Sequence, residues 1–276
     1  MKQRVPVLVL WLLSAVWAHS AALDVKLNLT SRKMYTGSLM GLSGQKVTFQ
    51  PNGSSTAVSI PVASIASVEF KFNADQQSKI SRLMAEGRYE ELDSELKTLL
   101  PAYLPYAALP ANLEEMLSRW VTASYWTGDY DQVQNLMAIA PQVKSPKLVN
   151  LTLFYGMLAR LDQGESQSVE AFLDTEKGLL IFPEGSAARL YIQTRLLQLD
   201  KQYVPAIRMA ADLLATHGRD ADWAPQAELL CEELYFQTGR PESAQAVLGS
   251  INECYTSPLI IKKAAAIAAQ NGMEKK

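Results

Sequence analysis

The pattern of apolar and polar residues divides the chain into two regions with different periods. From residue 23 to residue 73, apolar and polar side chains alternate in short runs, which is typical of strands with one buried face. Pro51, Asn52 and Gly53 form one of the turns between them, because Asn and Gly tolerate positive φ. The expected strands are "LDVKLNL", "KMYTGSLMGL", "KVTFQ", "AVSIPV" and "ASVEFKF". Five short strands predict a small β-barrel that is closed or nearly closed, because closure removes exposed sheet edges.

From residue 74 to residue 276, apolar side chains return every three or four positions. This spacing is typical of amphipathic helices. Asn73 and Asp75 are alternative N-caps of the first helix, so the boundary between the two regions is short. The predicted fold class is therefore α+β and mostly α. It consists of a five-stranded β-barrel at 23–73 followed by an α-α superhelix at 74–276.

The end of the chain has the features of a terminal helix. In the stretch 257–271, Pro258 lies near the first turn, and Gly272 follows the last one. We expect Lys262 and Lys263 on its outer face. The stretch is thus a predicted capping helix, which covers one end of the helical stack while the barrel covers the other.

One bend motif recurs five times in the helical region. In "WTGDYDQVQNLMAIAP", residues 126–141, apolar side chains follow Gly128 at the fifth and ninth positions. The same spacing follows Gly87, Gly164, Lys201 and Gly239. Successive bends are 41, 36, 37 and 38 residues apart. This period predicts stacked helix hairpins, since one hairpin cannot bury its apolar face alone.

These bends resemble those of the tetratricopeptide repeat, which carry Gly, then Asp or Lys, then Tyr. The expected turn residues are Gly87, Tyr89, Gly128, Asp129, Tyr130, Gly164, Tyr203 and Gly239. The bend at Gly164 departs from the pattern because Ser166 replaces the aromatic residue. The resemblance implies that the first helices of the hairpins line a concave groove for a protein or peptide. Asp129 is expected to be an N-cap, with Tyr130 against the neighbouring helix.

The stretch "LNLTSRKMYTGSL" resembles the first half of the Sm-like small barrel, a strand pattern that SH3-like barrels share. The matching positions are Leu27, Leu29, Gly37 and Leu39. Arg32 stands where that family usually has a turn glycine. Ser43 and Val47 replace the Asp and Asn with which RNA-binding members contact a base. The resemblance therefore implies the barrel shape without RNA binding.

The first 22 residues have the layout of a secretory signal peptide, with Lys2 and Arg4 before an apolar run and small residues after it. We expect cleavage after Ala22, or alternatively after Ser20, and export to the periplasm or the outside of the cell. A retained anchor helix is the alternative. Loss of the two basic residues changes the formal net charge from −2 to −4. An acidic chain without a later apolar run of ~18 residues predicts no nucleic-acid partner and no membrane span.

Cys231 and Cys254 both lie in the exported part, where a disulfide is possible. A helix hairpin that turns at 239–241 would place Cys231 opposite residue 249, about 7 Å of helix away from Cys254. Two separate thiols are therefore the alternative to a disulfide.

The candidate chemistry is sparse. His217, the one histidine beyond the leader, precedes Gly218 and is expected to cap a helix. One histidine and two distant cysteines do not give a zinc spacing. Ser43 and Lys46 match Ser-x-x-Lys, but they lie in a predicted hairpin and not at a helix start. We therefore expect no catalytic, cofactor-binding or metal-binding residues; an enzyme with an unrecognised site is the remaining alternative.

Aromatic and arginine side chains on the first helices mark the candidate binding face. The expected groove residues are Arg119, Tyr125, Tyr191, Arg195 and Gln198. Aromatic rings beside arginines suit the capture of an extended peptide. The sequence thus predicts an exported, non-enzymatic scaffold that binds a protein or peptide partner. A carbohydrate-binding or cell-wall accessory protein is the alternative.

Overall fold

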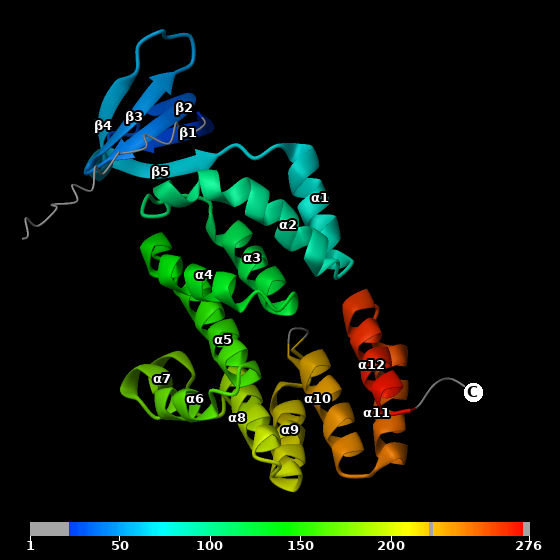
Figure 1. The fold of residues 1–276 in the computed structure, drawn as a ribbon. Helices are drawn as coiled ribbons and strands as arrows, with labels where there is room; N and C mark the ends of the chain where they lie inside the picture. The colour runs from blue at the N-terminus through cyan, green and yellow to red at the C-terminus, as the bar shows by residue number, and fades with distance from the viewer. Residues whose placement is uncertain (1–21, 221–222, 273–276) are drawn as a thin grey trace, which may run out of the picture.

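The structure is a computed structural model that describes residues 22–220 and 223–272. Apart from Ala22, the predicted signal peptide lies outside the described residues. The chain is α+β and mostly helical, with an antiparallel sheet followed by helices, as the sequence predicts (Figure 1). No helix in the described ranges combines the length and the apolar character needed to cross a membrane.

The sheet has five antiparallel strands in the order β4-β3-β2-β1-β5. The strands are β1 Leu23–Leu29, β2 Met34–Ser43, β3 Lys46–Pro51, β4 Val58–Pro61 and β5 Ile65–Phe70. The 3-10 turn Val62–Ser64 joins the last two. The strands β4 and β5 form the two edges and do not pair with each other, so the predicted closed barrel is wrong.

The edge of β5 is covered by a segment of the helical region. The amide of Val68 donates to the carbonyl of Pro110 at 2.8 Å. The side chain of Asn112 accepts from the backbone N–H of Phe70 at 2.8 Å and donates to its carbonyl at 3.1 Å. A side-chain amide thus takes the place of a neighbouring strand. This contact satisfies the backbone hydrogen-bonding groups at the edge of β5 without closure of a barrel. It is the physical reason why the sheet is open and not closed as predicted.

One face of the sheet continues the core of the helical region. Val25, Leu27 and Phe49 are fully buried there, in accordance with the alternating pattern. The ring of Phe70 lies 5.0 Å from that of Tyr103, in the turns between α2 and α3, and is perpendicular to it. The sheet is therefore packed against the first helices.

The helices follow one another as hairpins. They are α1 Ala74–Ala85, α2 Tyr89–Leu99, α3 Glu114–Trp126, α4 Tyr130–Val143, α5 Pro146–Asp162, α6 Ser166–Leu173, α7 Glu176–Ile181, α8 Ala187–Leu199, α9 Tyr203–His217, α10 Ala224–Gln237, α11 Pro241–Cys254 and α12 Pro258–Gln270. The side chain of Asn73 caps α1 by accepting from the N–H groups of Asp75 and Gln76. The short helices α6 and α7 together take the place of one long second helix.

The five bends share one backbone geometry. The bend residues have positive φ, and they are Gly87 (65°), Gly128 (76°), Gly164 (83°), Lys201 (59°) and Gly239 (69°). In each bend the next residue donates its N–H to the carbonyl five positions earlier, as Asp129 does to Ser124 at 2.9 Å. This bond satisfies a carbonyl at the helix end. The fifth residue after each bend is fully buried: Leu92, Val133, Val169, Ala206 and Ala244.

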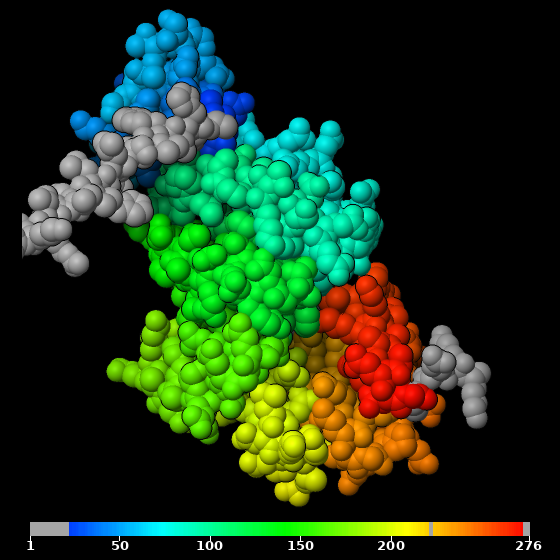
Figure 2. Space-filling model, viewed as in Figure 1, coloured from blue at the N-terminus to red at the C-terminus, as the bar shows by residue number. Residues whose placement is uncertain are grey.

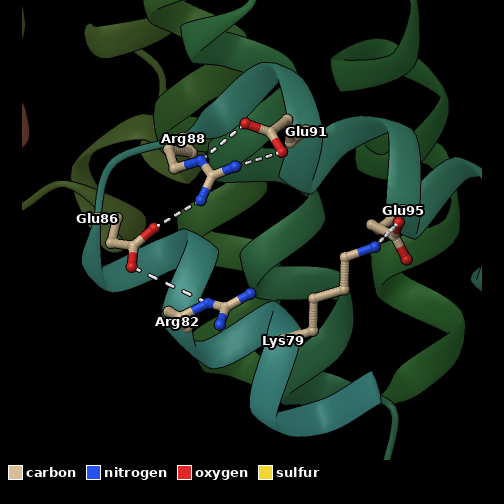
Figure 3. Close-up of polar contacts among 6 residues, drawn as sticks. All are labelled: Lys79, Arg82, Glu86, Arg88, Glu91 and Glu95. Atoms are coloured by element: carbon tan, nitrogen blue, oxygen red, sulfur yellow. Dashed lines mark hydrogen bonds and ion pairs between the residues drawn. The ribbon is translucent and has the colours of Figure 1, made fainter. Parts of the chain in front are cut away.

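Ion pairs cover the outer surface of the first hairpin (Figure 3). The guanidinium of Arg88 donates to Glu86 at 2.9 Å and to Glu91 at 2.6 Å across the bend. Lys79 of α1 pairs with Glu95 of α2. All these side chains are at least 30% exposed, so each pair stabilises the hairpin by less than about 1 kcal/mol.

The last helix, α12, returns to the first hairpin (Figure 1). A Cβ atom at Gly87 would lie 2.7 Å from the Cβ of Leu259. The Lys263 amine lies over the ring of Trp126 at the end of α3. In Figure 2 the red surface of α12 meets the surfaces of the helices at the start of the helical region. We use the name closure contact for the approach of Leu259 to Gly87 together with that of the Lys263 amine to Trp126. The expectation that Lys263 faces outward is wrong, because α12 folds back onto the earlier helices and turns this side chain toward Trp126. Lys262 is exposed, as expected.

The two cysteines are not bridged. Cys231 is buried in α10, and Cys254 is exposed at the end of α11. The bend at Gly239 lies nearer to Cys231 than to Cys254, so the two thiols are at different heights of the hairpin. The disulfide is therefore absent, and burial raises the pKa of the Cys231 thiol to about 12.

Candidate functional site

A pocket of about 290 Å³ lies on the inner side of the helical region. Its side chains come from α3, α5, α8, α10 and α12, so it exists because α12 folds back. The lining residues are Tyr125, Trp126, Asp162, Tyr191, Arg195, Gln226, Leu229, Leu230, Glu233, Lys263, Ala266, Ile267 and Gln270. We call this site the central pocket.

Arg195 is the centre of the pocket's charge network. Its guanidinium lies 3.0 Å from the carboxylate of Asp162 and 3.7 Å from that of Glu233. It also donates to the side-chain carbonyl of Gln198 at 2.8 Å. One cation between two carboxylates leaves one negative charge without an opposite charge in this group.

Asp162 also binds two tyrosine hydroxyls. The hydroxyl of Tyr125 donates to it at 3.1 Å and that of Tyr130 at 3.0 Å. Burial, reinforced by the nearby carboxylate, raises the pKa of Tyr130 to about 12. Both hydroxyls therefore remain protonated donors at physiological pH. With three donors around it, the Asp162 carboxylate has less free capacity for a ligand than Glu233. Among the described residues, Glu233 has only the distant guanidinium and a weak 3.5 Å contact to Gln237.

Aromatic rings form one wall of the central pocket. The ring of Tyr125 lies 4.8 Å from that of Trp126 and 5.1 Å from that of Tyr155. The ring of Tyr191 contacts Phe154 at 6.1 Å. These edge and tilted contacts fix the ring positions, so the wall is pre-formed.

Lys263 is the unusual group of the site. Its amine is buried and has no hydrogen-bond partner in the part of the chain that the structure describes. Burial lowers the pKa of the amine to about 6. The amine is therefore mostly uncharged at neutral pH, although it lies over an aromatic ring that also accepts a cation.

The predicted groove residues fall into three groups. Tyr125, Tyr191 and Arg195 line the central pocket. Gln198 is buried behind it, where it holds the guanidinium of Arg195 and donates to Gln237 at 3.2 Å. Arg119 is elsewhere: it links α3 to α1 through Ser81 at 3.0 Å and pairs with Glu115 on its own helix. Arg119 therefore does not line the central pocket, since its partners are Ser81 on α1 and Glu115 on its own helix.

Sequence reasoning missed Trp126, Asp162, Glu233 and Lys263. A signal for two of them was present, because Trp126 and Asp162 each lie two positions before a bend glycine. Gln237, which holds Gln198, has the same position before Gly239. At two of the five bends, this position thus supplies a lining residue of the central pocket. Glu233 and Lys263 have no such periodic signal.

A second pocket, of about 440 Å³, lies among α6, α8 and α9. Its polar residues include Glu170, Asp174 and Asp200, and none of the predicted groove residues lines it. Within the ranges that the structure describes, no cluster of three or more His, Cys, Asp or Glu side chains could hold a metal ion. The central pocket is therefore the better candidate, because aromatic and charged groups of both signs converge there.

Comparison with known proteins gives no match: no protein-family model, no curated protein and no solved structure is similar to this chain. The resemblances to the tetratricopeptide repeat and to the Sm-like barrel therefore stay predictions from the sequence.

Proposed function

We propose that this protein is an exported, non-enzymatic scaffold that binds a protein or peptide partner in the central pocket. The observation that carries the proposal is the convergence of aromatic rings, one arginine and two carboxylates from separate helices on one concave site. Aromatic and arginine side chains are the residues that most often anchor a protein interface. The predicted signal peptide supports a role in the bacterial periplasm or envelope.

The arrangement of the site supports binding through a pre-formed surface. The ring contacts of Tyr125 and the ion pairs of Arg195 fix these side chains before a ligand arrives. Pre-organised groups lose little conformational entropy when a partner binds. The proposed role therefore needs no large rearrangement of the helices.

Site-specific crosslinking tests the proposal. A photoreactive amino acid replaces Gln226 or Gln270, which line the central pocket, in cells that export the full chain. The matched control replaces Lys262, which is exposed on the other side of α12. We expect one discrete crosslinked partner from the two pocket positions and none from the control. Equal products from all three positions, or none from the pocket, would contradict the proposal.

A glycan ligand is the second candidate. The same observation favours it, since rings such as Tyr125 and Tyr191 stack on sugars while carboxylates accept hydroxyl hydrogen bonds. Co-sedimentation of the purified protein with insoluble peptidoglycan distinguishes the two. Sedimentation that is lost in Tyr191→Ala, without a crosslinked protein partner, would favour the glycan.

A further inference from the structure

The closure contact determines what size of ligand the central pocket admits. Without α12, the inner side of the helices would be an open groove for an extended peptide. With α12 in place, Lys263 and Gln270 line the same space as Tyr125 and Tyr191, and the volume of this space is about 290 Å³. This volume is at the lower limit of ligand pockets in general. It suits one side chain of a partner and not a long segment.

The charges of the pocket select the sign of that side chain. Asp162 and Glu233 carry two negative charges, and Arg195 supplies one positive charge between them. The second basic group of the lining, Lys263, has a desolvated amine without an acceptor among the described residues. At neutral pH the lining thus has an excess of about one negative charge, which favours a cationic ligand.

The available hydrogen-bonding capacity agrees with the charge. Asp162 already accepts from three donors, whereas Glu233, whose side chain is 36% exposed, has among the described residues only the guanidinium at 3.7 Å and the weak 3.5 Å contact to Gln237. Glu233 is therefore the free acceptor. The rings of Tyr125 and Tyr191 line the same space and attract a cation through their faces.

We infer that the central pocket binds the lysine or arginine side chain of a partner protein, with Glu233 as the ion-pair partner and the tyrosine rings as the walls. This inference rests on the proposed function and specifies its ligand. Lys263 of the chain itself shows how an amine packs there, because its amine lies over the ring of Trp126 in the same pocket.

Short peptides test the charge selection directly. The probes are fluorescein-labelled Ala-Ala-Xaa-Ala-Ala amides in which Xaa is Lys, Arg, norleucine or Glu, titrated with residues 23–276 at pH 8. We expect the Lys and Arg peptides to bind about tenfold or more tightly than the norleucine peptide, and the Glu peptide to bind most weakly. Preference for the Glu peptide, equal affinity for all four, or no binding of the Lys peptide would overturn the inference.

The variant Glu233→Gln tests the assigned ion pair with little change of shape. We expect it to lower the affinity for the Lys peptide about tenfold and to leave the norleucine peptide unchanged. The matched control is Glu253→Gln, at an exposed position on α11. Thermal melts of both variants exclude unfolding as the cause. Equal affinities for the Lys peptide in the two variants would remove Glu233 from the site.

The pH dependence gives an independent readout. Burial lowers the pKa of Lys263 to about 6, so a second cation enters the pocket as the pH falls from 8 to 5. The other groups that face this space are Asp162, Arg195, Glu233, Tyr125 and Tyr191. We expect the Lys peptide to bind at least fivefold more weakly at pH 5, and Lys263→Met to lose most of this change. An unchanged pH dependence in Lys263→Met would contradict the role of its amine.

The peptide test and the crosslinking test distinguish a failure of the cationic-ligand inference from a failure of the proposed function. Crosslinking from Gln226 together with indifference to peptide charge would refute the cationic ligand and keep the protein-binding role. Absence of crosslinking from the pocket would refute the protein-binding role itself, whatever the peptides do.

Discussion

Asp93 joins the first two hairpins through a buried carboxylate. It is 5% exposed and accepts from the indole N–H of Trp120 at 3.2 Å and from the hydroxyl of Ser124 at 2.9 Å. Lys97 pairs with Asp93 and also with Asp129 at the next bend. One short side chain on α2 thus satisfies two buried donors of α3, and the apolar pattern alone does not predict this contact.

We predict that Asp93→Ala lowers the free energy of unfolding by about 3 kcal/mol, because it leaves the donors of Trp120 and Ser124 buried and unpaired. Urea denaturation measures the change. The control is Glu90→Ala, an exposed position on the same helix, for which we expect a change within about 0.5 kcal/mol. Similar losses in both variants would show that Asp93 has no special role.

Glu232 makes stability depend on pH. It is fully buried, and within residues 22–220 and 223–272 its carboxylate has no hydrogen-bond partner. Burial raises its pKa to about 7. Below the usual pKa near 4.5, the group is protonated in both states. As the pH rises from there to 7, only the unfolded chain loses the proton, so stability falls; above 7 the loss is complete, at about 3 kcal/mol.

We therefore predict that Glu232→Gln is stabilised relative to the parent chain by an amount that grows between pH 4.5 and pH 8. Denaturation curves at pH 4.5, 6 and 8 measure this difference. Glu242→Gln, at the exposed start of α11, is the matched control. Its free energy of unfolding should change with pH in the same way as that of the parent chain. A constant difference across the pH range for Glu232→Gln would contradict the assignment.

At the scale of elements, the join between sheet and helices depends on Asn112. Its side chain makes both hydrogen bonds to the backbone of Phe70 that a neighbouring strand would make. We predict that Asn112→Ala lowers the free energy of unfolding by about 2 kcal/mol and speeds amide exchange at Phe70. Asn135→Ala, on the exposed face of α4, is the control. Unchanged exchange at Phe70 would mean that another group covers the edge.

The elements could be predicted from the sequence where a local period encodes them. The run "LDVKLNL" coincides with β1, and the five bends have the same geometry because glycine, or in one case Lys201, accepts positive φ there. The open sheet could not be predicted, since the partner of β5 is Asn112, more than 40 residues away in the chain. The division into α6 and α7 also lacks a periodic signal.

At the scale of the whole molecule, the closure contact distinguishes two glycines that look alike in the sequence. Gly87 and Gly128 both have positive φ, but only at Gly87 would a Cβ atom meet Leu259. We predict a loss of about 1 kcal/mol in Gly128→Ala from backbone strain alone. Gly87→Ala should lose more than this and should expose α12, measured by hydrogen exchange at residues 258–270. Equal exchange of α12 in the two variants would contradict the contact.

The candidate site was predictable only in part, because some of its residues are placed by long-range contacts. Tyr125, Tyr191 and Arg195 lie on first helices, which a repeating pattern identifies. Lys263 completes the site because α12 folds back across the whole helical region, and Arg119 is lost to a contact with Ser81 on the first hairpin. Long-range contacts of this kind leave no trace in a local period.

The return of α12 also sets the order in which the site is completed during synthesis. The chain is made from its N-terminus, so the sheet and the hairpins up to Cys254 exist before the helix that supplies Lys263. A chain cut short before residue 257 keeps most of its hydrophobic core and lacks one wall of the pocket. The central pocket is therefore complete only in a chain that extends through α12, which makes an intact pocket a marker of translation past residue 270.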